Sequence, residues 1–239
     1  MKSGFTLSSG IGKINRIETF LDIVGLSRNP LQLLGKNCVG VISWGSKPYS
    51  EKSQKLASKL SLPHIRVEDG FICSFGKQAD KQKYSLVKDS IGIYYDATQP
   101  SRLENLLNGT DVESWKLNDP GMAGKAAELM SRLIESGINK YNHLPSAIDA
   151  LAAVEDFVLV VDQTVGDQSV RLGGMDDRAF DAMLEEALAQ HPEHKVMVKV
   201  HPQVLAGKKQ GYLVAKARDR GVQLISGDLS DTQLSLIHI

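Results

Sequence analysis

The alternation of apolar and polar residues predicts a strand–helix–strand unit in the second half of the chain. Residues 157–161 and 196–198 are short apolar runs, as is typical of buried strands. Between them, five apolar residues recur with the helical period and would share one buried face: Phe180, Met183, Leu184, Ala187 and Leu188. A third apolar run, at residues 222–225, follows another helical stretch. This order predicts an α/β domain with a parallel sheet.

The first half shows the same alternation and is interpreted as a separate α/β unit. Strands are expected at residues 38–43, 64–67 and 91–95. Helices are expected at residues 51–60 with Ser50 as the N-cap, from Pro100 and Ser101 through Leu107, and after Pro120 with Gly137 at the end. The polar stretch at residues 139–149 marks the domain junction. We therefore expect one domain at residues 1–145 and the start of a second at residues 146–233.

The composition is that of a soluble globular protein. A chain of 239 residues that is 42% hydrophobic and 23% charged can bury a sizeable core. The 28 basic and 28 acidic residues balance, so a nucleic-acid partner is not expected. No segment approaches the roughly 20 apolar residues that span a bilayer, and a secretory signal is not evident. With only two cysteines, Cys38 and Cys73, the expected location is the reducing cytoplasm.

The C-terminus suggests an incomplete second domain. Its three expected strands are fewer than the five or six that are usual in such sheets. Residues 234–239, Leu-Ser-Leu-Ile-His-Ile, resemble the in-frame translation of a transposase sequencing adapter, and they are excluded from functional reasoning. We therefore expect a fragment that ends in an adapter-derived tail and is inactive as an enzyme.

Polar segments follow directly on two strands of the second half. The segment Asp162-Gln163-Thr164-Val165-Gly166-Asp167 follows the first strand, and Lys199-Val200-His201-Pro202 follows the second. Ligands of open α/β sheets bind beyond the carboxyl ends of the strands, so both segments should face one ligand. Lys199 and His201 are two residues apart and should share one side, whereas Val198 and Val200 should point into the packing.

Seven short segments stand in a consistent order between about residues 10 and 228. They are Trp44-Gly45-Ser46-Lys47-Pro48, Glu68-Asp69-Gly70-Phe71, Gly92-Ile93-Tyr94-Tyr95-Asp96-Ala97, Pro100-Ser101-Arg102-Leu103-Glu104, Lys140-Tyr141-Asn142, and the two polar segments given above. Together they resemble the capsule polysaccharide biosynthesis proteins of the KpsC type. The resemblance implies two Rossmann-like halves in a GT-B-like arrangement, of which the second is incomplete here.

The same resemblance implies the first module of a retaining β-Kdo transferase. Such an enzyme transfers Kdo from CMP-Kdo to a lipid acceptor of the phosphatidylglycerol type or to the growing Kdo linker. Its expected partners are CMP-Kdo, this acceptor and other capsule biosynthesis proteins at the inner membrane. The expected cytoplasmic location then includes peripheral binding to the inner face of that membrane. No metal or separate cofactor is expected, because CMP-Kdo is itself the donor substrate.

Retention by double displacement needs one carboxylate that attacks the anomeric carbon and a second group that deprotonates the incoming hydroxyl. By resemblance, Asp167 is the expected nucleophile and Glu68 the expected base. Asp69 is the alternative to Glu68, because neighbours on an extended chain face opposite ways. The expected substrate-binding residues are His201, Lys199, Gln163, Asp69 and Lys47. Lys199 and His201 are placed to neutralise the phosphate charge that develops as CMP leaves.

Structural alternatives remain for these residues. Asp162 and Asp167 could cap the following turn and helix, and His201 could be a loop histidine. Tyr94 and Tyr95 are interpreted as core or as cleft wall. The resembling proteins commonly carry an arginine where this chain has Cys73, and a guanidinium there could bind the carboxylate of Kdo. Nearby Arg66 could take over that role. The alternative function is a noncatalytic sugar-nucleotide or lipid-binding subunit of a capsule assembly complex.

Overall fold

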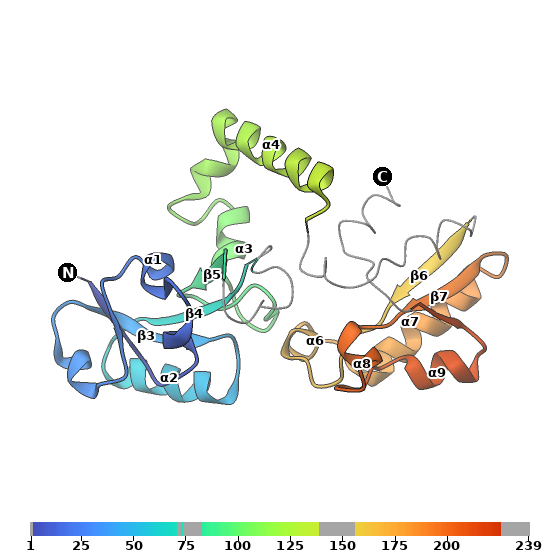
Figure 1. Ribbon diagram of the computed structural model, residues 1–239, viewed down its shortest axis with the longest axis horizontal. Helices are drawn as coiled ribbons and strands as arrows, with labels where there is room; N and C mark the ends of the chain where they lie inside the picture. The colour runs from blue at the N-terminus through green and yellow to red at the C-terminus, as the bar shows by residue number, and fades with distance from the viewer. Residues whose placement is uncertain (1, 71–72, 74–82, 139–155, 226–239) are drawn as a thin grey trace. The chain divides into compact units, whose positions relative to one another are not determined.

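The computed structural model describes residues 2–70, 73, 83–138 and 156–225 (Figure 1). The chain divides into two compact units, Met1–Lys140 and Tyr141–Ile239. The domain boundary predicted after residue 145, the polar stretch at 139–149 and the adapter-like tail all lie outside the described residues.

The first unit is built on a five-stranded sheet in the order β2-β1-β3-β4-β5. Its strands are β1 (Ser3–Thr6), β2 (Leu26–Ser27), β3 (Cys38–Trp44), β4 (His64–Asp69) and β5 (Leu86–Asp89). The first four are parallel, and β5 pairs antiparallel with β4. The strands predicted at residues 38–43 and 64–67 are confirmed. Because β3 and β4 are parallel, their carboxyl ends, at Trp44 and Asp69, lie at one edge of the sheet.

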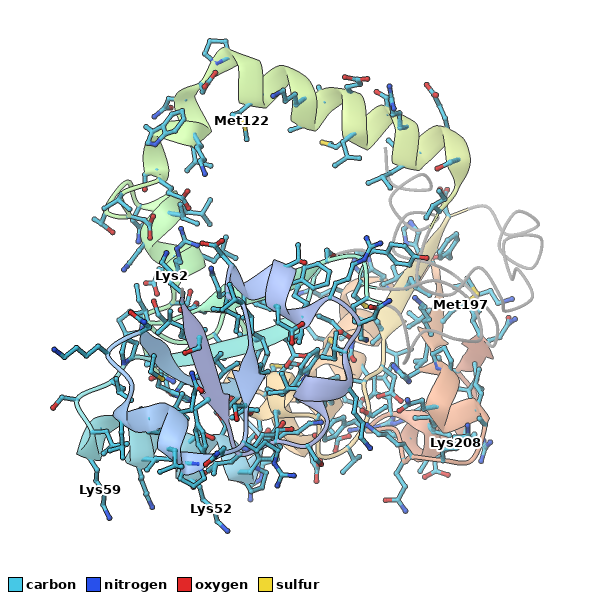
Figure 2. The ribbon with its side chains drawn as sticks, turned by 60° about the vertical axis from the view of Figure 1, so that its left-hand side comes forward. Lys2, Lys52, Lys59, Met122, Met197 and Lys208 are labelled. Atoms are coloured by element: carbon cyan, nitrogen blue, oxygen red, sulfur yellow. The ribbon has the colours of Figure 1, made fainter. Side chains whose placement is uncertain are left out.

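Helices cover both faces of this sheet. Helix α1 (Ile17–Leu21) packs on one face and α2 (Pro48–Lys59) on the other. The unit also contains α3 (Arg102–Leu107), α4 (Pro120–Ser136) and the 3-10 turns η1 (Ile11–Lys13), η2 (Pro30–Leu34) and η4 (Ser114–Asn118). Ile42 packs in a cluster with Ile17 of α1, whereas its neighbour Val41 packs with Ala57 of α2. The alternation of side chains along β3 thus supplies two hydrophobic layers. Lys52 and Lys59 of α2 project away from the sheet (Figure 2).

The predicted start of α2 is wrong. The helix begins at Pro48, with Lys47 in the N-cap position, because the fixed φ of proline suits the first helical residue. Ser50, the predicted cap, is instead buried inside the first turn. Its Oγ lies 2.7 Å from the Oγ of Ser43 on β3, so it joins the helix to the sheet.

The strand predicted at residues 91–95 is also wrong, because these residues form a tight loop after β5. The buried carboxylate of Asp89 accepts hydrogen bonds from the backbone N–H groups of Ile91 (2.7 Å), Gly92 (2.9 Å) and Arg102 (2.8 Å). Ile93 is fully buried beneath the loop. The apolar pattern of residues 91–95 therefore belongs to an anchored loop and not to a strand. The helix predicted through Leu107 is confirmed as α3, which has a capping box at Ser101.

Helix α4 begins and ends as predicted, at Pro120 and with Gly137 as its C-cap at a φ of 59°. Nearly all of its side chains are exposed; Met130 is 62% and Ile134 is 43% exposed. Figure 2 shows Met122 near its start. Within the described residues, no helix is long and apolar enough to cross a membrane.

The second unit contains a parallel sheet in the order β6-β7-β8. Its strands are β6 (Phe157–Val161), β7 (Lys195–Lys199) and β8 (Gln223–Ile225), and its helices are α6 (Gln168–Leu172), α7 (Asp177–Gln190), α8 (Pro202–Leu205) and α9 (Val214–Asp219). All three predicted strands and the long helix between the first two are confirmed. Phe180 and Leu184 of α7 pack with Val198 of β7 in the core, as the helical period indicates. Helix α6 was anticipated only through the alternative in which Asp167 caps a following turn and helix.

Candidate active site

The first group of candidate residues lies where β4 ends. Glu68 accepts a hydrogen bond at Oε1 from the backbone N–H of Asp69 (3.1 Å) and at Oε2 from the hydroxyl of Tyr95 (3.4 Å). Burial raises the pKa of Glu68, although hydrogen bonds from the Asp69 backbone, Trp44 and Tyr95 act in the opposite direction. This carboxylate therefore holds a proton more readily than an ordinary glutamate. That property suits a general base working near neutral pH.

Asp69 has a different environment from Glu68. Its Oδ1 lies 2.8 Å from Nζ of Lys83, and this ammonium lies 5.9 Å from the centroid of the Trp44 ring. This ion pair already engages Asp69 with a cation, so Asp69 suits electrostatic binding better than proton transfer. These contacts favour Glu68 over Asp69 as the base. The assignment itself stays a prediction, as does a substrate contact of exposed Lys47 at the start of α2.

Gly45, directly after β3, leaves the space in which Glu68 and Tyr95 meet. A Cβ atom on Gly45 would lie 2.5 Å from Oε2 of Glu68 and 2.7 Å from the hydroxyl oxygen of Tyr95. Its φ of +51° also disfavours any residue with a side chain. Sequence reasoning found Gly45 only as part of a family motif. It placed Tyr95 in the core or the cleft wall and missed its contact with Glu68.

The expected substitute for the missing arginine is held elsewhere. Arg66 is only 6% exposed and donates from Nη2 to Oε1 of Gln54 on α2 (3.2 Å). Cys73 is also buried. The proposed transfer of the arginine role to Arg66 stays a prediction, and its contact with α2 indicates a structural role.

The second group lies at the carboxyl ends of β6 and β7. Val161 pairs with Lys199, so the two polar segments follow neighbouring strands at one sheet edge, as predicted. Asp162 is buried there, and its Oδ1 accepts from the backbone N–H groups of Gln163 (2.8 Å), Tyr212 (3.0 Å) and Leu213 (3.1 Å). Burial raises the pKa of Asp162 against these hydrogen bonds. Asp162 thus holds the loop before α9 against the end of β6, a structural role.

Asp167 is the N-cap of α6, as the structural alternative expected. Its Oδ1 accepts hydrogen bonds from the backbone N–H of Ser169 (2.9 Å) and from the Ser169 hydroxyl (2.8 Å). Within the described residues Oδ2 accepts no hydrogen bond, so one oxygen of this half-buried carboxylate is available to a substrate. Gly166, at a φ of +81°, forms the tight turn before it. Capping and nucleophilic attack are therefore compatible at Asp167.

Lys199 and His201 supply donors at the same sheet edge. Lys199 is the last residue of β7, and His201 is the N-cap of α8. Nδ1 of His201 accepts from the backbone N–H of Gln203 (3.1 Å), so in the neutral ring Nε2 carries the proton. Val198 and Val200 are 0% and 1% exposed, which confirms the predicted alternation. Gln163, a predicted substrate-binding residue, accepts at its backbone carbonyl from the N–H of Tyr212 (3.4 Å).

These features define an α/β protein with two Rossmann-like units of the GT-B-like kind, each carrying polar side chains at the carboxyl edge of its parallel strands. The sequence matches the family described as "Capsule polysaccharide biosynthesis protein" over residues 39–143 and 126–235, and the chain belongs to that family.

Curated relatives and a solved structure support this assignment. The chain is 36% identical to the capsule polysaccharide modification protein LipA of Neisseria meningitidis serogroup B, over 98% of this chain and 32% of LipA. It is 29% identical to the lipopolysaccharide-processing protein LpsZ of Rhizobium meliloti, over 78% of this chain and 42% of LpsZ. The chain thus spans less than half the length of these relatives.

Among solved structures, the chain is similar to KpsC of Thermosulfurimonas dismutans, described as a beta Kdo 2,4 transferase. The TM-score is 0.78 at 35% sequence identity, over 94% of this chain and 68% of that one. This similarity confirms the predicted fold class.

Proposed function

We propose that this chain carries two carboxylate sites of a retaining β-Kdo transferase of capsule biosynthesis. The observation that carries the proposal is the similarity to a β-Kdo transferase over 94% of the chain. Glu68 and Asp167 support it, because Glu68 lies at the carboxyl end of β4 and Asp167 follows β6, where α/β enzymes place reactive groups. The donor would be CMP-Kdo, and the acceptor a lipid of the phosphatidylglycerol type or the growing Kdo linker.

In the first proposed step, Oδ2 of Asp167 attacks the anomeric carbon of Kdo. The bond from this carbon to the phosphate oxygen breaks, and CMP leaves with the electron pair. The ammonium of Lys199 and the Nε2–H of His201 stabilise the charge that develops on the phosphate. Asp167 then carries Kdo as an ester. Because protein side chains supply this stabilisation, the proposal includes no resident metal or cofactor.

In the second proposed step, Glu68 takes the proton of the acceptor hydroxyl. The acceptor oxygen attacks the anomeric carbon, and the bond to Asp167 breaks with return of its carboxylate. Two inversions give net retention of configuration. The raised pKa of Glu68 makes it a stronger base than an ordinary glutamate.

The proposed setting is the cytoplasmic side of the inner membrane, where a lipid acceptor and the other capsule biosynthesis proteins would be met. The alternative, a noncatalytic sugar-nucleotide or lipid-binding subunit, keeps the same site without turnover. The capping role of Asp167 is the observation in its favour, since an N-cap needs no reactive oxygen.

The test compares two proteins: this 239-residue chain, and a chimera in which residues 1–233 replace the matching part of Thermosulfurimonas dismutans KpsC. Both are incubated with CMP-Kdo and a Kdo-bearing acceptor. We expect the chimera to form a β-linked product by NMR, and mass spectrometry to find one Kdo residue on the peptide that contains Asp167. Donor binding without product would favour the binding subunit, and a product of inverted configuration would exclude the ester mechanism.

A further inference from the structure

The hydroxyl of Tyr95 lies between two groups of the first site. The backbone N–H of Ser46 donates to it (3.1 Å), and it lies 3.4 Å from Oε2 of Glu68. An ionised carboxylate can only accept hydrogen bonds. Tyr95 is therefore the donor to Glu68, while the Ser46 N–H fixes the hydroxyl oxygen from the other side.

Tyr95 stands on a loop that is fixed at both ends. Asp89 binds three backbone N–H groups at the start of the loop and the start of α3. Beyond Tyr95, Asp96 accepts from the backbone and the hydroxyl of Thr98 (3.0 and 2.6 Å) and from Nε2 of Gln99 (2.6 Å). A side chain on Gly92 would come within 2.2 Å of the carbonyl oxygen of Pro100, which shows how tightly the loop folds. Such a loop can hold a side chain in one position.

The donors around Glu68 leave limited room for another hydrogen bond. A carboxylate offers about four acceptor positions. The Asp69 N–H, the Trp44 indole and the Tyr95 hydroxyl donate to it from within the described residues. About one position is then left for an incoming hydroxyl, and the three donors set its direction.

We propose that Tyr95 is a positioning residue that holds the Glu68 carboxylate in the orientation from which it takes the proton of the acceptor hydroxyl. The proposal rests on the base role given to Glu68 above. Gly45 belongs to the same arrangement, because any side chain there would occupy the space of the contact.

Loss of the Tyr95 hydroxyl should change the pKa of Glu68 measurably. Burial raises the pKa of Tyr95, which keeps its proton available for donation. Its hydrogen bond favours the charged form of Glu68 and so lowers a pKa that burial has raised. Without the hydroxyl, the pKa of Glu68 should rise further.

The experiment is a carbon NMR titration of glutamate side chains in the donor-free 239-residue chain, with Glu68→Gln identifying the Glu68 signal. We expect Tyr95→Phe to move the Glu68 midpoint to higher pH. Tyr94→Phe is the matched control, because its ring packs edge-to-face on Tyr95 with centroids 5.2 Å apart. It should leave the midpoint in place. In the KpsC chimera, the acidic limb of kcat/KM for transfer should move in the same direction.

An unchanged or lower midpoint in folded Tyr95→Phe would overturn the proposal. If Tyr95→Phe does not fold, fluorotyrosine placed at position 95 gives the complementary test. As a stronger donor it should lower the midpoint, and no shift would count against Tyr95. Failure of the proposed function is distinguishable: full transfer in Glu68→Gln would remove Glu68 as base, while the titration would still report on the contact with Tyr95.

Discussion

The two candidate carboxylates, Glu68 in the first unit and Asp167 in the second, are held in opposite ways. Both oxygens of Glu68 accept hydrogen bonds from neutral donors, and burial raises its pKa. Asp167 is half-buried, and within the described residues only its Oδ1 accepts hydrogen bonds, which cap a short helix. The environment of Glu68 suits proton exchange, whereas the environment of Asp167 leaves Oδ2 without a hydrogen-bond partner among the described residues.

This difference matches the demands of double displacement. A nucleophile must stay ionised and present a lone pair, whereas a base must bind a proton reversibly near the working pH. A capping carboxylate has the right geometry for the first task, because the helix orients one oxygen and leaves the other available. A desolvated carboxylate has the right pKa for the second task. If the two carboxylates exchanged environments, neither would suit its proposed task.

The largest effect is expected from Asp167→Asn. Asparagine caps helices as well as aspartate does, so α6 should persist while the nucleophile is lost. We expect transfer by the KpsC chimera to fall by about a thousandfold or more. Asp176→Asn is the matched control, because Asp176 caps α7 in the same unit through a hydrogen bond to the N–H of Ala179 (2.9 Å). Equal rates for the two variants would remove Asp167 from the reaction.

Glu68→Gln should lower the transfer rate by about 10²–10⁴-fold, the usual contribution of a general base. It should also stabilise the fold. A carboxyl whose folded pKa is raised adds stability below its unfolded pKa of about 4.3, and that stability is lost as pH rises through the folded value. At pH 7 ionised Glu68 therefore costs stability. Thermal melts should show Glu68→Gln unfolding at a higher temperature than wild type at pH 7, with the difference vanishing near pH 4.

Asp69→Asn decides between the neighbouring carboxylates. Because Asp69 is paired with Lys83, we expect this variant to weaken substrate binding without moving the pH profile. If it moved the acidic limb of the profile and Glu68→Gln did not, Asp69 would be the base.

Lys199→Ala and His201→Asn should each slow departure of CMP by about 100-fold, the equivalent of about 3 kcal/mol for one lost donor. Asparagine at position 201 can still accept the hydrogen bond that caps α8. The control is Lys195→Ala, at the exposed amino end of β7. Release of CMP is measured in a single turnover, and wild-type rates in both site variants would show that neither side chain contacts the phosphate.

The sequence predicts the sheets better than the contacts between distant residues. The apolar runs at 38–43 and 196–198 predict strands because a strand buried on both faces has a continuous apolar signal. The run at 91–95 gives the same signal for another reason, since Asp89 anchors a loop and Ile93 is buried beneath it. Local hydrogen bonds determine whether such an apolar run forms a strand or a loop, and the periodicity of apolar residues does not indicate these bonds.

The candidate site shows the same division. The cap at Asp167 is local and could be predicted from an aspartate after a glycine turn. The contact between Tyr95 and Glu68 joins residues 27 positions apart and needs the space left by Gly45. Apart from the glycine itself, nothing in the sequence indicates the positive φ at position 45. Nonlocal packing, which one sequence does not encode as a pattern, therefore determines the pKa of Glu68.

The smallest expected effect concerns the acid stability of the two units. In the first unit, His64 Nε2 lies 2.8 Å from Oγ of Ser43, and Nδ1 is buried without a hydrogen-bond partner among the described residues. Burial, followed by the nearby charge of Arg66, lowers the pKa of His64 to about 4. A protonated ring would need acceptors for both nitrogens, and it would have none at Nδ1.

The unfolded chain takes up this proton near pH 6.5, before the folded chain does. The contribution of His64 to stability is therefore complete above pH 6.5 and is lost as pH falls toward 4. We expect the urea midpoint of the first unit to drop between pH 7 and pH 5, and His64→Gln to reduce that drop. Both tryptophans, Trp44 and Trp115, lie in the first unit, so their fluorescence reports its unfolding selectively. His194→Gln, on the exposed surface of the second unit, is the control, and an equal reduction in that variant would exclude His64 as the cause.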